Sequence, residues 1–452
     1  MLSIEIIDAN YSVIKNFTKE EYNLCRSILS YKTPIYYGGK LLYQTNFLLH
    51  GKTFKFPTGA LPILLEHKKF KNIIPYTIEN EINEKKISIP ISDNLEEYQK
   101  YIITEINKNQ RCIIQLPTGA GKSYMISYIA HHLKQPTIII VPTEEILNQI
   151  KEQLEKIYKE KVSIIHGSKE EIQHNIILTT GQTLYSRYEL YTEEEKFLHI
   201  KCILADEVQY YGANTFFKAS FLFPNAYFRL GFSATPLGRS DNADLRTLSI
   251  FSSHIITYDT TLIHRVVPVH VVFIKYDHIP EPMEMDKILG EISMLEHTYE
   301  GLLKSKARLE AIFKLLTKLI NNNLSFICFV DRLEYGENIS NYLNIPFVHS
   351  NNKERTEIIN QLKDEKIKGI ISTIGKEGLD IPSLDVVVNT SREATIISLG
   401  QKAGRARRKT EEKNVALVFD FEDHQFPLVR RWSNKRKSIY KKFASSINIS
   451  LI

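Results

Sequence analysis

The sequence predicts an α/β protein in which a small α+β module precedes two doubly wound parallel-sheet domains. From about residue 92, short apolar strands alternate with amphipathic helices, which is typical of a parallel sheet covered by helices on both faces. The alternation begins again near residue 264, and the texture of residues 1–90 differs from both. We therefore predict three parts: 1–90, 91–263 and 264–452.

The N-terminal part combines a helix signal with glycine turns. SIEII is typical of a strand, and Thr18 with Glu21 has the spacing of a capping box, which predicts a helix over TKEEYNLCRSIL. IYYGGKLLY and FLLHGKTFKF place glycines between apolar-aromatic runs, which predicts hairpins. For this α+β module we weigh contact with the protein's ligand against a packing scaffold or a partner-binding domain, and the motifs given below make DNA the ligand in question.

In the first larger domain, RCIIQL, TIIIVP, KCILADE and FRLGFSATP are the expected strands. In the second, the strands are PVHVVFI, SFICFV, GIISTI, VVVNT and VALVFDF, with helical runs between most of them. The acidic, Met-containing residues 278–300 fit a linker helix or an insertion equally well.

Composition restricts the class of protein. The apolar fraction of 43% and the charged fraction of 24% are typical of a globular chain, and no apolar run nears the ~18 residues of a membrane span. The N-terminus lacks a signal-peptide pattern, so we expect a cytoplasmic protein with no membrane partner. The cysteines, Cys25, Cys112, Cys202 and Cys328, show no CxxC spacing, which argues against an iron–sulfur cluster and favours buried core thiols.

Positive charge gathers at the C-terminus. The net charge is +6, yet Gly400–Ile452 holds thirteen Lys or Arg against five Asp or Glu. This excess favours a polyanion partner, with a solvated surface as the alternative. Trp432 fits core packing better than base stacking. We expect the last basic helix to hold nucleic acid through Arg430, Arg431, Lys435, Arg436, Lys437, Lys441 and Lys442.

A phosphate-binding loop follows the strand RCIIQL and opens a helix, which is the context such a loop requires. Glycines let backbone N–H groups converge on phosphate oxygens, and the helix N-terminus adds its dipole. Lys122 suits the β- and γ-phosphates, and Ser123 suits Mg²⁺. Leu116 stands where the strict pattern has glycine. The loop comprises Pro117, Thr118, Gly119, Ala120, Gly121, Lys122 and Ser123.

Asp206 and Glu207 close the strand KCILADE. A carboxylate pair at the carboxyl end of a strand, some 85 residues after the loop, predicts a second phosphate-site element. Asp206 would hold Mg²⁺ and Glu207 would polarise the attacking water. A surface turn is the alternative.

Gln401, Gly404, Arg405 and Arg408 are spaced i, i+3, i+4 and i+7, which places them on one face of a helix. Guanidinium groups suit the charge that develops on a γ-phosphate. Because the second larger domain has no phosphate loop of its own, we expect this helix to serve the nucleotide of the first. A basic surface helix is the alternative.

These residues belong to an ordered series of motifs: Tyr98-Gln99, PTGAGKS, VPTEEILNQ, TTGQTL, DEVQ, SATP, STIGKEGLDIP and QKAGRARR. The series resembles superfamily 2 helicases over about residues 95–410. The resemblance implies two RecA-like domains with ATP in the cleft between them, and ATP hydrolysis that drives movement on nucleic acid.

The resemblance also implies roles by position. Tyr98 and Gln99 would bind the base, with Gln99 reading adenine, although Glu96 and Glu97 stand where an arginine is frequent. Gly378 and Asp380 would lie near the nucleotide, and Arg408 would be the arginine finger beside Arg405. The motif DEVQ has Gln209 in place of a titratable residue. Phosphate-backbone contacts are implied for Thr143, Gln182 and Thr373, and coupling of hydrolysis to strand separation for Gln209, Ser233 and Thr235.

Within the superfamily, FPTGALPILLE and SNKRKSIYKKFA resemble segments of phage branch-migration helicases of the UvsW type. This resemblance implies an ATP- and Mg²⁺-dependent DNA helicase that acts on forks and Holliday junctions in replication, recombination or repair. The alternatives are an RNA helicase, a duplex-DNA translocase subunit of restriction type, and a clamp without hydrolysis. Protein partners stay open, and a monomer is the working expectation.

Overall fold

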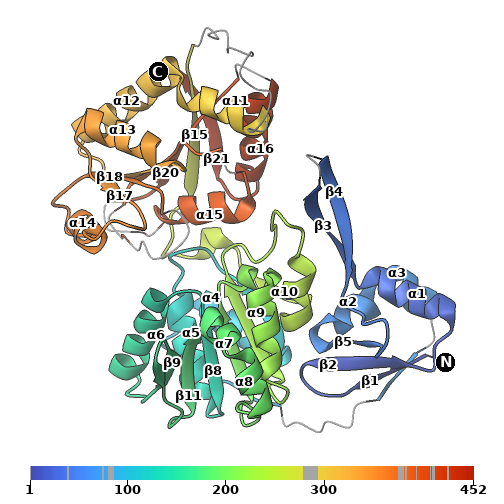
Figure 1. The fold of residues 1–452 in the computed structure, drawn as a ribbon. Coiled ribbons are helices and arrows are strands. Elements are labelled where there is room, and N and C mark those ends of the chain that lie inside the picture. Colours follow the sequence, from blue (N-terminus) through green and yellow to red (C-terminus); the bar gives the residue numbers. More distant parts are fainter. Residues whose placement is uncertain are drawn as a thin grey trace. The chain divides into compact units, whose positions relative to one another are not determined.

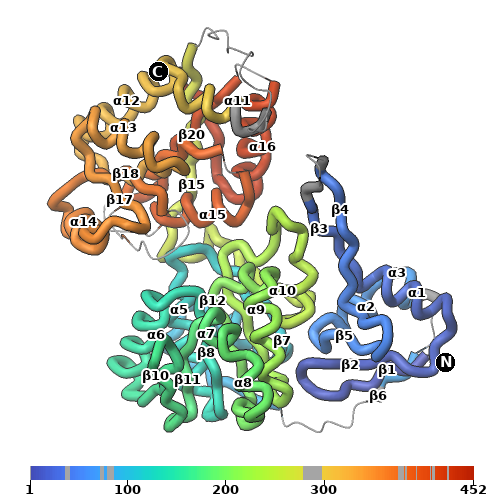
Figure 2. The backbone as a smooth tube through the Cα atoms, in the orientation of Figure 1, coloured from blue at the N-terminus to red at the C-terminus, as the bar shows by residue number. Residues whose placement is uncertain are grey.

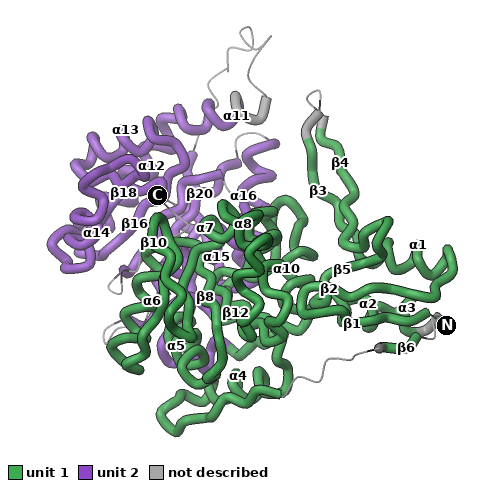
Figure 3. Tube along the Cα trace, turned by 60° about the horizontal axis from the view of Figure 1, so that its bottom comes forward, with its two compact units in different colours: residues 1–116, 121–259 green, residues 117–120, 260–452 purple. Residues whose placement is uncertain are grey.

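The computed structural model confirms the predicted α/β class, and it forms two compact units. The first comprises residues 1–116 and 121–259, and the second comprises residues 117–120 and 260–452 (Figure 3). Each unit is described by itself. The structure describes residues 2–37, 40–73, 76–79, 86–277, 294–374, 381, 384–392, 394–407, 409, 413–424 and 427–451.

The N-terminal residues build a small α+β module around a sheet of order β5-β2-β1-β6 (Figure 1). Strand β1 is antiparallel to β2 and parallel to β6. Phe56, Leu64 and Phe70 are fully buried in the hydrophobic core of the module. The elements are β1 (Leu2–Ile6), β2 (Tyr11–Lys15), α1 (Lys19–Ile28), β5 (Lys55–Pro57), η1 (Thr58–Ala60), α2 (Leu61–Glu66), α3 (Lys68–Ile73) and β6 (Tyr76–Glu79).

Two of the local predictions for this module are confirmed and one is wrong. Thr18 and Glu21 form the capping box of α1, with the Thr18 backbone N–H donating to the Glu21 carboxylate at 2.7 Å. IYYGGKLLY forms the antiparallel ribbon of β3 (Ser30–Tyr37) and β4 (Lys40–Phe47). FLLHGKTFKF is not a hairpin, because the chain turns after His50 and β5 then pairs with β2, which buries Phe56.

The module is joined to the rest of the first unit by buried polar contacts. The guanidinium of Arg229, 1% exposed, donates to Oδ1 of Asn10 at 2.6 Å. Asn10 in turn donates from Nδ2 to the carbonyl of Phe221 at 2.7 Å. The backbone N–H of Ala9 donates to the carbonyl of Pro224 at 2.8 Å. Since buried polar groups are costly to leave unpaired, this seam holds the module firmly on its neighbour.

Gly59 shows why the FPTG segment needs its glycine. A Cβ at this position would lie 2.3 Å from the carbonyl oxygen of Ser249, in α10 (Asp244–Phe251). Backbone therefore packs on backbone here, and a larger residue would push the module off the helix.

The rest of the first unit is a doubly wound sheet of order β10-β9-β11-β8-β12-β13-β7-β14 within the described residues. All neighbouring strands are parallel except β10, which is antiparallel to β9. The strands are β7 (Arg111–Gln115), β8 (Thr137–Val141), β9 (Ser163–His166), β10 (Lys169–Glu170), β11 (Ile176–Thr180), β12 (Cys202–Asp206), β13 (Phe228–Ser233) and β14 (Ile255–Thr257).

Helices cover both faces of this sheet (Figures 1 and 2). Helix α6 buries Leu147, Ile150 and Leu154 at helical spacing, whereas Ile157, its last residue, is 54% exposed. The helices are α4 (Glu97–Lys108), α5 (Lys122–Leu133), α6 (Glu144–Ile157), α7 (Gly181–Ser186), α8 (Tyr188–Glu193), η2 (Val208–Gly212), α9 (Asn214–Ala219), η3 (Ser220–Leu222) and α10.

The second unit is a second doubly wound sheet, of order β17-β18-β16-β19-β20-β15-β21 and parallel throughout where the structure describes it. Of the stretch 278–300, for which a linker helix or an insertion was expected, residues 278–293 lie outside the described residues, and the remainder begins α11 (Met294–Leu303). The strands are β15 (Val269–Lys275), β16 (Phe326–Phe329), β17 (Phe347–Val348), β18 (Gly369–Ser372), β19 (Val386–Asn389), β20 (Ala416–Phe421) and β21 (Ser446–Leu451).

The C-terminal strand β21 was not predicted. The basic helix, α16 (Pro427–Tyr440), precedes this strand, and its Trp432 packs against the core near Tyr299, as predicted. The helices of this unit are η4 (Thr260–Leu262), α11 (Met294–Leu303), α12 (Lys306–Asn321), α13 (Leu333–Leu343), α14 (Arg355–Lys363), α15 (Ile396–Gly404) and α16 (Pro427–Tyr440).

Arg436 corrects the expectation that the whole basic helix faces a polyanion. Its guanidinium is 1% exposed and donates from Nε to Asp420 at 2.9 Å and from a terminal nitrogen to Asp423 at 3.1 Å. Lys437 is held in an ion pair with Glu422. Arg436 is therefore part of the protein interior, because its charge is already balanced by the two aspartates.

The cysteines are buried and unpaired, as expected. Among the helices that the structure describes, none has both the length and the apolarity that crossing a bilayer requires.

Candidate nucleotide-binding site

The carboxyl ends of the parallel strands in the first unit meet at one edge of the sheet. Strand β7 leads into the glycine-rich loop, β12 ends at Asp206 and β13 ends at Ser233. These three strands are neighbours in the order β12-β13-β7. In open α/β sheets this edge is where ligands bind, so the topology brings the predicted loop and the predicted carboxylates together.

The loop has the backbone conformation that a phosphate cradle needs. Gly119 and Gly121 have φ of 87° and 76°, in the left-handed region that favours glycine. The backbone N–H of Ala120 donates to the carbonyl of Pro117 at 3.2 Å, which closes a tight turn. Gly121 is the N-cap of α5 and supplies no side-chain cap, so the first N–H groups of α5, from Lys122 on, are left to an anion.

Asp206 and Glu207 end β12 side by side. Asp206 is 5% exposed, and burial together with the negative charge of Glu207 raises the pKa of its carboxyl group, while the positive charge of Lys122 opposes the rise. The pair therefore carries more negative charge than Lys122 offsets, and a divalent cation suits it. Glu207 has a φ of 52°, which lies in the left-handed region that non-glycine residues rarely adopt.

Gln209 links the DEVQ and SATP segments. Its Nε2 donates to Glu207 at 2.7 Å, and its Oε1 accepts from the hydroxyl of Ser233 at 2.6 Å. The Ser233 hydroxyl also accepts from the backbone N–H of Thr235 at 2.9 Å. The carboxylate next to Asp206 is thus connected by hydrogen bonds to the end of the adjacent strand.

Tyr98 and Gln99 lie at the start of α4. The Tyr98 hydroxyl lies 3.9 Å from the position that a Cβ on Gly121 would take, so this side chain borders the phosphate loop. Gln99 is 1% exposed; its Oε1 accepts from the backbone N–H of Glu96 at 3.0 Å, and its Nε2 donates to the Tyr98 hydroxyl at 3.2 Å. The amide therefore caps α4, and adenine reading by Gln99 stays a prediction that must use its remaining hydrogen-bonding positions.

Three residues predicted to contact phosphate backbones follow parallel strands. Thr143 caps α6 after β8, and Gln182 is exposed at the start of α7 after β11. Because β8 and β11 are neighbours, Thr143 and Gln182 lie at the same edge of the sheet. Thr373 follows β18 in the second unit and is half-buried.

The predicted arginine-bearing helix is shorter than expected. Helix α15 ends at Gly404, and Arg405 is its C-cap. The chain continues through Arg407 in tighter turns, with the N–H of Arg405 donating to the carbonyl of Lys402 at 3.1 Å. Gly378, Asp380 and Arg408 fall outside the described residues.

Lys402, which no sequence pattern singled out, is 6% exposed on α15. Its Nζ donates to Asn389 at 3.0 Å and to Ser391 at 2.6 Å. Asn389 donates to Asp420, which also binds Arg436. Lys402 thus anchors α15 to the buried charge cluster, while Gln401, 5% exposed, has a buried Oε1 without a partner among the described residues. A lysine between glutamine and alanine in a predicted helix carries no local signal of such burial.

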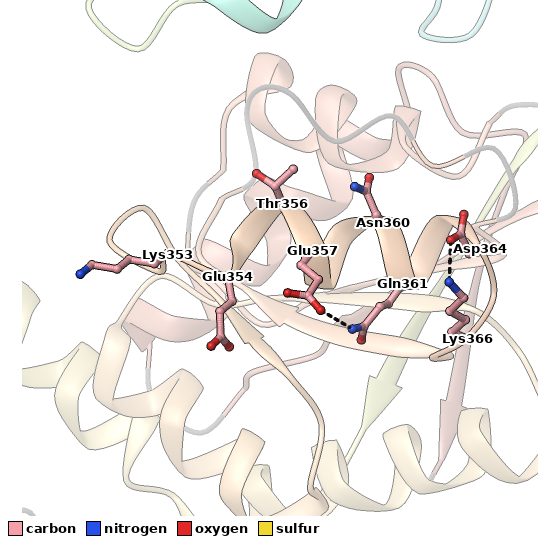
Figure 4. Close-up of a pocket in the computed structure, with 8 residues that line it drawn as sticks. All are labelled: Lys353, Glu354, Thr356, Glu357, Asn360, Gln361, Asp364 and Lys366. Carbon is pink, nitrogen blue, oxygen red and sulfur yellow. Dashed lines mark hydrogen bonds and ion pairs between the residues drawn. The ribbon is translucent and has the colours of Figure 1, made fainter.

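A separate hollow lies along α14 and contains none of the predicted site residues (Figure 4). Gln361 donates to Glu357 at 3.4 Å and Lys366 to Asp364 at 3.1 Å, so its polar groups pair with one another. It is lined by Lys353, Glu354, Thr356, Glu357, Asn360, Gln361, Asp364 and Lys366.

Comparisons with known proteins now bear on this arrangement. Residues 92–238 match the family model "Type III restriction enzyme, res subunit", and residues 307–410 match "Helicase conserved C-terminal domain". The chain is a superfamily 2 helicase. The predicted enzyme class is therefore confirmed: this helicase hydrolyses ATP and acts on nucleic acid.

Several individual proteins are similar to this helicase in sequence or in fold. DNA 3'-5' translocase XPB2 of Sulfurisphaera tokodaii is 24% identical over 77% of this chain and 88% of its own length. The S. cerevisiae Dbp5 structure, bound to RNA and ADP BeF3, is similar in fold with a TM-score of 0.55 and 16% identity, over 78% of this chain and 89% of that chain. T4 UvsW matches 100% of this chain and 99% of its own with 17% identity and a TM-score of 0.45.

Proposed function

We propose that this helicase is a DNA motor that unwinds or branch-migrates forks and Holliday junctions. The main observation in support of an ATP-driven motor is the arrangement at one edge of the first sheet. There the phosphate loop follows β7, and Asp206 and Ser233 end the neighbouring strands β12 and β13. Support for DNA comes from the similarity to a protein named as a DNA translocase. The branched substrate is supported by the FPTG and C-terminal segments, whose resemblance is to branch-migration helicases.

For the nucleotide, we propose that the loop from Pro117 to Ser123 cradles the phosphates of ATP. Asp206 and the Ser123 hydroxyl would hold Mg²⁺, and Glu207 would orient the attacking water. The raised pKa of Asp206 supports this role, because a bound divalent cation would offset the charge that burial disfavours. Mg²⁺ supplies charge neutralisation on the phosphates, and Lys122 adds a second cation there.

For the second unit, we propose that Gln401, Arg405 and Arg408 act on the same ATP, with Gly378 and Asp380 close to it. Guanidinium groups stabilise charge on a transferring phosphoryl group. The buried Oε1 of Gln401, which has no partner within the part of the chain that the structure describes, supports a role in ligand binding, since such atoms in native interiors call for a partner. Arg405→Lys would keep the charge but lose the planar fork, and we expect it to lower ATP hydrolysis.

For coupling and nucleic-acid contact, we propose that Thr143, Gln182 and Thr373 bind phosphates of one strand. Changes at Glu207 during ATP hydrolysis would reach the bound nucleic-acid strand through Gln209, Ser233 and Thr235. The relay is supported by two hydrogen bonds of Gln209, which donates to Glu207 and accepts from the hydroxyl of Ser233.

The test is a single panel of substrates in one assay. ATP hydrolysis and strand separation are measured with a fork, a Holliday junction, a linear duplex, single-stranded DNA and an RNA duplex, using the wild type, Lys122→Ala and the control Lys156→Ala. Lys156 is an exposed lysine in the same unit. We expect forks and junctions to stimulate hydrolysis and to be opened, Lys122→Ala to be inactive and Lys156→Ala to match the wild type.

The other outcomes separate the alternatives. Better opening of RNA duplexes than of forks would favour an RNA helicase. Displacement of a third strand from duplex DNA without opening of forks would favour a restriction-type translocase. No stimulation by any nucleic acid, or full activity of Lys122→Ala, would exclude the proposed motor.

A further inference from the structure

The ribbon of β3 and β4 pairs with no other strand among the described residues. It extends away from the four-stranded sheet of the module (Figures 1 and 2). Its register pairs Ile35 with Leu42 on one face and Pro34 with Tyr43 on the other. Ile35, Leu42 and Tyr43 are 39%, 46% and 57% exposed. Large apolar side chains are thus exposed on both faces of the outer half of the ribbon, which marks a binding surface rather than a packed core.

The base of the ribbon is held to the unit on both faces. The guanidinium of Arg26, in α1, lies 4.0 Å from the centre of the Phe47 ring. The guanidinium of Arg246, in α10, lies 5.6 Å from the centre of the Tyr31 ring. Phe47 pairs with Ser30, so it lies on the face opposite to Tyr31. Because these cation–π contacts anchor the two faces, the outer half has a defined position on the first unit, which also carries Asp206.

The charge around the ribbon suits a polyanion. Between Tyr22 and Leu65 the sequence has five Lys or Arg and no Asp or Glu, although 52 acidic residues in 452 would place about five in an average stretch of this length. A protein partner with its own mixed charges would have no need of such a bias. Nucleic acid, with one charge per phosphate, is the partner that this stretch fits.

Unpaired bases fit the exposed side chains better than duplex does. The outside of a duplex presents phosphates and sugars, whereas the faces of bases become accessible only when they are unstacked. Aromatic and apolar side chains bind such faces without regard to sequence, and basic residues nearby hold the backbone. Tyr43, with its neighbours Leu41 and Leu42, offers this combination at the outer end of β4.

We propose that the outer half of the β3–β4 ribbon stacks on unpaired bases at the point where the duplex opens. Tyr43 is the principal contact, with Leu42 and Ile35 on the other face. The ribbon would prevent the separated strands from pairing again behind the motor. This inference rests on the proposed DNA motor and names the surface of the N-terminal module that serves it.

The test uses the full chain and forked DNA with 5-iododeoxyuridine at successive positions around the junction. Ultraviolet crosslinking followed by mass spectrometry identifies the residue attached to each position. The same forks are used to measure the number of base pairs opened per ATP hydrolysed for the wild type, Tyr43→Ala and Tyr43→Phe. Tyr342→Ala is the matched control, since Tyr342 is 70% exposed on α13 and lies outside the ribbon.

We expect Tyr43 to crosslink to nucleotides at the junction. Tyr43→Ala should open about fivefold fewer base pairs per ATP, as loss of one base–aromatic stack implies, while Tyr43→Phe and Tyr342→Ala keep the wild-type ratio. Absence of the crosslink together with an unchanged ratio in Tyr43→Ala would overturn the proposal. Self-association of the wild type that Tyr43→Ala abolishes, measured by sedimentation, would assign the ribbon to a second copy instead. If no DNA stimulates hydrolysis by the wild type, the proposed motor fails, whatever the ribbon does.

Discussion

Asp206 in the first unit and Asp423 in the second are both almost fully buried, at 5% and 1% exposure. Burial raises the pKa of Asp206, and Glu207 raises it further. Burial acts on Asp423 in the same direction, yet the guanidinium groups of Arg308 and Arg436 hold its pKa below the ordinary value. The difference lies in whether the chain supplies enough positive charge to each carboxylate. A carboxylate that is satisfied internally serves the fold, and one that is not is available for a cation from outside.

The satisfied cluster joins several elements of the second unit. Arg308, on α12, donates to Asp423 at 2.9 Å and to the carbonyl of Thr390 at 2.9 Å. Arg436, on α16, bonds both Asp420 and Asp423. Through Asn389 and Lys402 the cluster reaches α15, so it holds the helix that carries Gln401 and Arg405 in place. Its expected role is therefore positional.

The largest effect is expected from breaking this cluster. Asp423→Asn leaves two buried guanidinium groups short of a negative charge, and we expect the second unit to lose about 3–5 kcal/mol of unfolding free energy. Urea denaturation with hydrogen exchange of the amides in residues 294–451 measures it. Glu422→Gln is the control: its ion pair with Lys437 is about one-fifth exposed and should contribute about 1 kcal/mol or less. Equal losses in both variants would contradict the comparison.

The substitution Asp206→Asn should lower activity rather than stability. We expect ATP hydrolysis to fall on the order of 10²-fold or more, because a cation ligand is lost, while stability without nucleotide stays the same or rises. Steady-state ATPase rates and thermal unfolding measure the two effects. Asp93→Asn, at an exposed aspartate of the same unit, should change neither. A variant that hydrolyses ATP normally would remove Asp206 from the proposed site.

Arg229 extends the comparison to a buried cation. None of its hydrogen-bond partners in the described part of the chain is a carboxylate. Its partners are the carbonyls of Ala226, Phe223 and Ser220 and Oδ1 of Asn10. Burial therefore lowers its pKa well below the ordinary value. Asn10→Ala should cost about 1–3 kcal/mol and loosen the module, seen as faster proteolysis within residues 2–79. Asn225→Ala removes an exposed amide–carbonyl bond of 2.7 Å and should cost much less.

Much of the fold was predictable because apolar periodicity reports strands and helices directly. The positions of the glycine-rich loop and of Asp206 at the ends of strands were predictable, because each follows an apolar strand directly in the sequence. Arg436 was not: a count of charges treats every arginine alike, and its partners Asp420 and Asp423 are brought to it only by the packing of α16 on β20. The burial of Lys402 could not be predicted for the same reason, because its partners Asn389 and Ser391 are brought to it only by packing. Strand β21 was missed since SINISL, with exposed residues at its end, lacks a buried apolar run.

The smallest expected effect tests the sign of the Asp206 shift. A carboxyl group whose pKa is higher in the folded than in the unfolded state opposes folding while it is charged, and this penalty disappears as the pH falls through the folded pKa. Without nucleotide or Mg²⁺, Asp206→Asn should therefore be more stable than the wild type at pH 8, and the advantage should shrink towards pH 5. Asp423, with its pKa lowered, predicts the opposite course for the second unit, whose stability is lost as the pH falls below the ordinary range of an aspartate. Unfolding free energies of the wild type, Asp206→Asn and Asp423→Asn at several pH values measure the two trends. If the advantage of Asp206→Asn instead grew on acidification, the buried carboxylate would already have its positive charge from the chain, and the contrast with Asp423 would not hold.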